Sequence, residues 1–226
     1  MPKPTLILLP GLVCDKTVWQ AQIQAFSPTH NIIIPDLSNA STPEAMVEAA
    51  LKNAPDSFAL AGHSMGGWVA LMVMGAAGER VNKLALLNTC ATKDTKEKTE
   101  SRLNMIAMLQ AGEVDALVQR LLSVYIYKQS CEVVVKQMIL RNMNAFINEE
   151  KAMLVRESCE LILPHIQCKT LIIHANQDKI FNFEDAKIMC DNIAHSALAS
   201  IDQCGHLSPM EAPAAVNDYL ARWLSG

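Results

Sequence analysis

Residues 58–70 of this chain read FALAGHSMGGWVA. An apolar run leads into Ser64, which has glycines two positions before and after it, and a second apolar run begins at Trp68. This is the pattern G-x-S-x-G between a short buried strand and a helix. The glycines lack the Cβ atoms that would collide where strand and helix meet. A serine on such a sharp turn is exposed for attack on a carbonyl if a base is within reach. The stretch therefore predicts a strand–turn–helix with Ser64 as candidate nucleophile.

The same local pattern also fits an ordinary glycine-rich turn or an anion-binding helix N-terminus. Whether Ser64 is a nucleophile therefore depends on whether the chain also supplies a base and an acid for it. A serine nucleophile needs a histidine base oriented by a carboxylate, and in this kind of turn the chain order is Ser, then Asp or Glu, then His. Asp178 follows a predicted buried strand at 169–174, and His206 follows the next strand at 197–201. Asp36 precedes Ser64 and is the weaker candidate. Asp202 lies before the histidine loop turns, which also favours Asp178.

With these motifs the chain resembles the α/β-hydrolase superfamily, in particular a small, capped serine hydrolase of the esterase type. The resemblance is carried by the turns Leu9-Pro10-Gly11 and Pro35-Asp36-Leu37, the elbow at residues 62–67, Asp178, and Cys204-Gly205-His206. It implies that Ser64 is the nucleophile, Asp178 the acid and His206 the base. It also implies an oxyanion hole formed by the amides of Leu12 and Met65. The family usually has His-Gly where this chain has Pro10-Gly11.

Apolar strand and amphipathic helix patterns alternate along the chain, which is typical of a parallel sheet covered by helices. We expect an α/β fold, the α/β-hydrolase fold, with a mostly parallel six-stranded sheet, helices on both faces and a small helical cap. The family's usual initial antiparallel hairpin is expected to be missing. The expected strands are 5–9, 31–34, 58–62, 83–87, 169–174 and 197–201, and the expected helices are 18–26, 43–53, 64–77, 184–193 and 211–224.

The alternation stops between Thr92 and Pro164, where apolar residues recur at helical spacing without a convincing strand. By the resemblance, 93–163 is a helical cap inserted into a core formed by 1–92 and 164–226. The insertion is rich in methionine. We expect most of these methionines to pack the cap on the core and a minority to line an adaptable pocket. The methionines concerned are Met105, Met108, Met138, Met143 and Met153.

Composition narrows the class of protein. The chain has 226 residues, half of them hydrophobic, and a formal net charge of -4, so nucleic acid is not an expected partner. No apolar run approaches the length of a membrane span. Seven single cysteines without a C-x-x-C pair favour reduced thiols and a cytoplasmic protein.

We expect no metal and no cofactor, and interpret His174 as a strand end. A reactive thiol at Cys204 is the alternative nucleophile.

The predicted activity is hydrolysis of a small, mainly apolar carboxylic ester through an acyl-enzyme intermediate on the Ser-His-Asp triad. A thioesterase, lactonase, amidase or carbon–carbon bond hydrolase would use the same residues, because the fold does not determine the substrate. A different class, a non-catalytic receptor for a small ligand, remains open, as does the oligomeric state. Ser64 and its two partners are the common premise of all the enzymatic alternatives.

Overall fold

A single parallel sheet forms the centre of the computed structural model, which describes residues 2–225. Within these residues the sheet has six strands in the order β2-β1-β3-β4-β5-β6, and every neighbouring pair is parallel. The strands are β1 Thr5–Leu9, β2 Asn31–Ile33, β3 Phe58–His63, β4 Val81–Leu87, β5 Lys169–Ala175 and β6 Ser196–Ile201. The α/β class and the six predicted strands are thereby confirmed.

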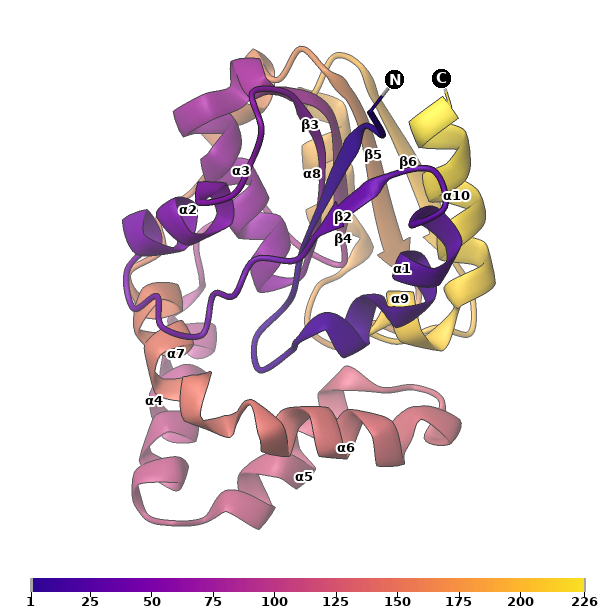
Figure 1. The fold of residues 1–226 in the computed structure, drawn as a ribbon. Coiled ribbons are helices and arrows are strands. Elements are labelled where there is room, and N and C mark those ends of the chain that lie inside the picture. The colour runs from indigo at the N-terminus through magenta and orange to yellow at the C-terminus, as the bar shows by residue number, and fades with distance from the viewer. Residues whose placement is uncertain (1, 226) are drawn as a thin grey trace.

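Helices cover both faces of the sheet (Figure 1). The helices α2 Pro43–Leu51, α3 Met65–Ala77 and α8 Phe183–Asn192 lie on one face, and α1 Gln20–Phe26 and α10 Pro213–Ser225 lie on the other. Because both faces are covered, the central strands are mainly apolar, and every residue of β3 is buried. The edge strand β2 is only half-buried.

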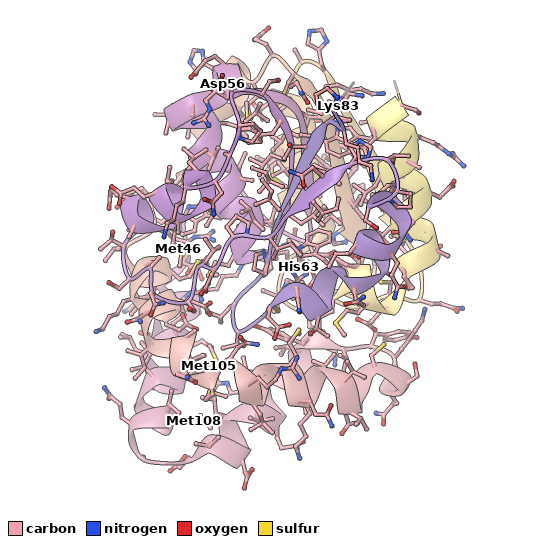
Figure 2. All side chains as sticks on the ribbon, viewed as in Figure 1. Met46, Asp56, His63, Lys83, Met105 and Met108 are labelled. Atoms are coloured by element: carbon pink, nitrogen blue, oxygen red, sulfur yellow. The ribbon has the colours of Figure 1, made fainter. Side chains whose placement is uncertain are left out.

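Four helices lie between β4 and β5, beyond the carboxyl ends of the strands (Figure 1). They are α4 Lys96–Gln110, α5 Val114–Tyr125, α6 Glu132–Arg141 and α7 Phe146–Leu154. Figure 2 shows Met105 and Met108 in this helical segment, while Asp56 and Lys83 lie toward the opposite end of the sheet. The segment falls within the range 93–163. Its assignment as a cap remains a prediction.

Most predicted helices differ from the observed ones by one or two residues at an end, and two of these differences have a clear local reason. The predicted helix 211–224 begins two residues later, as α10, and the separate short helix α9 Ser208–Glu211 precedes it, because Pro213 disfavours helical geometry at the preceding Ala212. The predicted helix 64–77 begins one residue later, at Met65, because Ser64 has a positive φ of 55°. In the described part of the chain, no helix combines the length and the apolar character that crossing a membrane requires.

Candidate active site

Ser64 lies at the junction of β3 and α3, in a backbone conformation that an L-residue rarely adopts. Its φ is 55° and its ψ is -120°. Two neighbouring contacts hold it there: its N–H donates to the Leu87 carbonyl at 2.9 Å, and the Thr89 hydroxyl donates to the Ser64 carbonyl at 2.8 Å. Strain of this kind persists only where the surroundings enforce it, and it is concentrated at functional sites.

His206 and Asp178 complete a continuous line of hydrogen bonds with Ser64. The Ser64 hydroxyl lies 2.8 Å from His206 Nε2, and His206 Nδ1 lies 2.9 Å from Asp178 Oδ2. An ionised carboxylate only accepts hydrogen bonds, so Nδ1 carries the proton and Nε2 is free to accept the serine proton. The sheet brings the three residues together because β3, β5 and β6 are parallel and each residue follows the carboxyl end of one of them.

The Asp178 carboxylate is stabilised in its charged form. Burial alone would raise the pKa of Asp178, but the adjacent His206 and the hydrogen bonds outweigh burial and lower the pKa to about 2. The Ile180 amide donates to Oδ1 at 2.8 Å, and the Asn88 side-chain amide donates to Oδ2 at 2.9 Å. Asp178 therefore remains ionised at neutral pH and can orient His206. Asn88, just after β4, has no pattern in the sequence that would have identified it.

His63 is a structural neighbour of this line rather than part of it. Its Nε2–H donates to the backbone carbonyl of His206 at 2.8 Å. Desolvation, together with the adjacent His206, lowers the pKa of His63 to about 3, so this buried imidazole is neutral. It holds the histidine loop in place.

The peptide unit joining Leu12 and Val13 is held from both sides by the helical segment. The Tyr125 hydroxyl of α5 donates to the Leu12 carbonyl at 3.1 Å, and the Val13 N–H donates to Glu149 Oε2 of α7 at 2.7 Å. Val13 has a positive φ of 49°, which is unusual for a β-branched residue. Leu12 is the residue predicted to supply an oxyanion-hole amide. Its backbone orientation therefore depends on two helices that lie more than a hundred residues away in the chain.

The Glu149 carboxyl is buried, and this changes its protonation. Desolvation is the main cause that raises the pKa of Glu149 to about 8, and the neighbouring Glu150 and Asp36 add to it, while the bond from Val13 opposes it. A carboxyl with an ordinary pKa of 4.5 when unfolded thus binds a proton on folding between about pH 4.5 and about pH 8. Because the folded state holds more protons in this interval, the contribution of Glu149 to stability falls as the pH rises through it.

Replacement of Glu149 by Gln should remove this pH dependence while leaving an oxygen to accept from Val13. The free energy of unfolding of Glu149→Gln, relative to the wild type, should rise between about pH 5 and about pH 9 by about 4 kcal/mol, most of the value of the full pKa shift. Urea denaturation of both proteins at both pH values measures this difference in the free energy of unfolding. Exposed Glu79→Gln is the control, and an equal pH dependence in both variants would contradict the assignment.

Ser64 opens into a cavity of about 260 Å³ between the sheet and the helical segment. Leu12 and Met65 line the same cavity. Met65 is the first residue of α3, and its amide has no partner within the helix, so it is free to bind an oxyanion. Of the five methionines singled out in the sequence, Met105 and Met153 line the cavity. Its remaining apolar wall consists of Leu121, Val124, Tyr125, Ile180 and Phe181.

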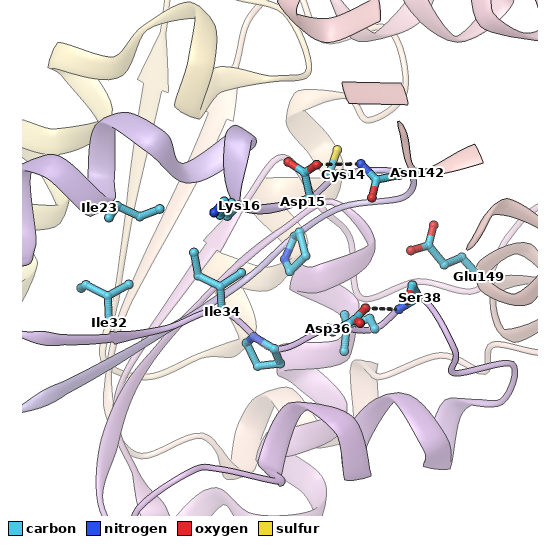
Figure 3. Close-up of a pocket in the computed structure, with 13 residues that line it drawn as sticks. Cys14, Asp15, Lys16, Ile23, Ile32, Ile34, Asp36, Ser38, Asn142 and Glu149 are labelled. Atoms are coloured by element: carbon cyan, nitrogen blue, oxygen red, sulfur yellow. Dashed lines mark hydrogen bonds between the residues drawn. The ribbon is translucent and has the colours of Figure 1, made fainter. Parts of the chain in front are cut away.

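A larger cavity of about 540 Å³ lies elsewhere, along β2 and the loops after β1 and β2 (Figure 3). Its carboxylates have local structural partners: Asp36 accepts from the Ser38 amide at 2.9 Å, and Asp15 accepts from the Asn142 side chain at 2.9 Å. Its lining brings no serine together with a histidine. Size therefore does not identify the site, and the smaller cavity at Ser64 is the candidate.

The alternative nucleophile, Cys204, is buried beside the histidine loop. Desolvation, followed by the charge of Glu211, raises the pKa of the Cys204 thiol to about 12. The thiol is therefore protonated at neutral pH, and a thiol of this kind is a poor nucleophile. Its sulfur lies 3.6 Å from the Gly205 carbonyl.

Comparisons with known proteins agree with this architecture. A sequence profile described as Alpha/beta hydrolase family matches residues 6–219. An esterase from Thermogutta terrifontis has a similar structure, with a TM-score of 0.88, 24% identity, and coverage of 99% of this chain and 90% of the esterase. The enol-lactonase from Burkholderia xenovorans LB400 gives a TM-score of 0.86 at 17% identity, covering 100% of this chain and 93% of that protein.

A third similar structure is a 2-hydroxy-6-oxo-6-phenylhexa-2,4-dienoate hydrolase from Rhodococcus sp. strain RHA1. Its TM-score is 0.78 at 19% identity, with coverage of 99% of this chain and 91% of that one. A search of curated protein sequences finds no match. At these identities the structural neighbours establish the fold, and the choice of substrate must come from the site.

Proposed function

The chain belongs to the alpha/beta hydrolase family, and from this premise we propose that it is a serine hydrolase that cleaves a small carboxylic ester through Ser64, His206 and Asp178. The observation that carries the proposal is the pair of hydrogen bonds, 2.8 Å and 2.9 Å long, that links the three side chains. This is the arrangement in which a histidine can remove a serine proton while a carboxylate stabilises the resulting imidazolium.

The proposed reaction has two halves. His206 Nε2 takes the proton from the Ser64 hydroxyl as its oxygen bonds to the ester carbonyl carbon. The amides of Leu12 and Met65 stabilise the oxyanion of the tetrahedral intermediate, the kind of contact that accounts for about 10²–10³-fold in rate per donor. The protonated His206 then gives its proton to the leaving alcohol. In the second half His206 activates a water molecule, which releases the carboxylic acid from Ser64.

We propose that residues 93–163 act as a cap, with 1–92 and 164–226 as the catalytic core. The support is that helices of this segment supply the cavity wall that faces Ser64, including Met105 and Tyr125. A cap of this kind excludes water during the reaction and selects the substrate.

The alternatives share the triad and differ in the bond that is cleaved. Two of the structural neighbours are named as an esterase and an enol-lactonase, and both act on an acyl–oxygen bond by name. A third is named as a dienoate hydrolase. An ester is therefore the primary candidate and a lactone the second. A non-catalytic receptor is disfavoured because a buried ionised Asp178 aligned on His206 has no evident use in passive binding.

Covalent labelling combined with a substrate panel tests the proposal. A fluorophosphonate probe should modify the native chain once, on the peptide that contains Ser64, and heat-denatured chain should remain unlabelled. The panel compares p-nitrophenyl esters, thioesters and lactones of matched acyl groups. We expect turnover of the esters with an initial burst of p-nitrophenol. Saturable binding of these compounds without labelling or turnover would favour the receptor and overturn the proposal.

A further inference from the structure

The cavity at Ser64 contains more positive than negative side chains. Four cationic residues line it, against one acidic residue. The cations are Lys98, Arg102, Arg120 and Lys179, and the acid is Asp94. This lining differs from the mainly apolar pocket that the sequence predicts, because Lys98 and Arg102 on one helix meet Arg120 and Lys179, which lie elsewhere in the chain.

One of the four cations is neutralised inside the protein. Arg102 Nε lies 2.6 Å from Asp94 Oδ2, and Arg102 Nη1 lies 2.8 Å from Glu150 Oε2. The Asp94 side chain is 6% exposed and the Glu150 side chain 0%. Arg156 lies 3.5 Å from the other oxygen of Asp94, so two arginines and two carboxylates form a balanced, buried ion cluster. Arg102 and Asp94 are thus structural parts of the cavity wall.

The other three cations have neutral partners only. Within residues 2–225, Lys98, Arg120 and Lys179 form no ion pair. Arg120 donates to the Ser101 hydroxyl at 2.9 Å, and Lys179 donates to the Ser123 carbonyl at 2.8 Å. The Asp94 carboxylate in the lining is already paired with arginines, so these three cations have no carboxylate partner and repel one another, which makes an anion the favourable occupant.

Two of these cations, Lys98 and Lys179, can be placed relative to the proposed triad, and Arg120 lines the same cavity. Lys98 Nζ lies 4.7 Å from the centroid of the Phe181 ring, and that ring lies 5.8 Å from the imidazole of His206. Lys179 follows Asp178 directly in the chain. An anionic group held here would therefore belong to the same substrate whose carbonyl lies at Ser64.

We propose, on the premise of the ester hydrolysis proposed above, that the substrate carries a carboxylate apart from the scissile bond, bound by Lys98, Arg120 and Lys179. A guanidinium binds a carboxylate through two parallel hydrogen bonds, and the two ammonium groups add point charges around it. The apolar wall formed by Met105, Leu121 and Val124 receives the hydrocarbon that joins the carboxylate to the ester. A cavity with low-dielectric walls also concentrates anionic substrate by focusing the field.

A matched pair of substrates tests the proposal. The p-nitrophenyl monoester of adipic acid carries a free carboxylate, and the p-nitrophenyl ester of monomethyl adipate is its neutral counterpart. The wild type should hydrolyse the anionic ester with a kcat/KM at least about tenfold higher, and this preference should shrink as salt is added. Equal kcat/KM values for the two esters, or a preference for the neutral one, would overturn the proposal.

Variants that remove one positive charge each test which residues cause the preference for the anionic ester. Each of Lys98→Gln, Arg120→Gln and Lys179→Gln should lower kcat/KM for the anionic ester about threefold to fivefold, the range of a partly exposed ion pair, and leave the neutral ester unchanged. The matched control is Lys96→Gln, on the same helix as Lys98 but exposed and outside the cavity lining. An equal loss for both esters, or a loss in the control, would contradict the assignment.

A binding measurement separates this inference from the proposed function. Calorimetry on Ser64→Ala compares the affinities for the same two esters without needing turnover. If the wild type hydrolyses neither ester, the proposed function fails, while a preference of Ser64→Ala for the anionic compound still supports the carboxylate site. If both esters are hydrolysed and Ser64→Ala binds them equally, the carboxylate site fails and the hydrolase stands.

Discussion

Ser64→Ala should reduce kcat for p-nitrophenyl butyrate by at least about 10⁴-fold, because no other group in the line from Asp178 to His206 can form the acyl-enzyme. The residual rate should be that of binding and oxyanion stabilisation alone. Circular dichroism should be unchanged, since among residues 2–225 the serine hydroxyl bonds only to His206. Steady-state hydrolysis and single-turnover release of p-nitrophenol measure the effect.

Two further variants make this result specific. Ser57→Ala, in the exposed loop at the other end of β3, should keep full activity. Ser64→Gly should be as inactive as Ser64→Ala but more stable by about 1 kcal/mol, because glycine accepts a φ of 55° without strain. An active Ser64→Ala enzyme would remove Ser64 from its role.

Gly62→Ala should destabilise the protein by about 3 kcal/mol or prevent folding, the largest stability effect that we expect of a single methyl group. A Cβ at this position would lie 2.2 Å from the Gly66 carbonyl oxygen and 2.7 Å from the Cα of Gly67. These are backbone atoms of α3, so they cannot turn aside as a side chain can. The strand and the helix of the elbow would have to separate.

Gly78→Ala, after the end of α3, is the matched control. Its Cβ would lie 3.4 Å from the terminal methyl of Met74, an ordinary contact with a flexible side chain. Stability should be unchanged or slightly raised, since alanine restricts the unfolded chain. Urea unfolding compares the two variants. Equal midpoints for Gly62→Ala and Gly78→Ala would show that the elbow is not packed as the structure describes.

The parts of the site that could be predicted from the sequence are those with a local signature. Ser64 has flanking glycines, an apolar strand before it and an apolar helix after it. Asp178 and His206 each follow a recognisable strand, and parallel topology brings such positions to one edge of the sheet. Outside the site, the interruption between α9 and α10 also has a local cause in the sequence, because Pro213 disfavours a helical conformation at the residue before it.

The groups that tune the site could not be predicted in the same way. Glu149 stands in the stretch Asn148-Glu149-Glu150-Lys151, which reads as a solvent-exposed helix face, yet Glu149 and Glu150 are both buried. Their burial depends on Val13 and Arg102, partners that only the folded chain brings close. Cation clustering at the cavity has the same origin, because Lys98 comes from α4, Arg120 from α5 and Lys179 from the loop after β5.

The two hydrogen bonds on the Leu12–Val13 peptide have a consequence for the proposed catalytic cycle. A movement of α5 and α7 wide enough to admit a substrate would break the bonds from Tyr125 and to Glu149, and the loop carrying the Leu12 amide would relax from its positive-φ turn. Entry and chemistry would then be mutually exclusive states of one molecule. An acyl-enzyme could be formed and hydrolysed only after the helices had returned, so the turnover rate would be bounded by the rate of that return.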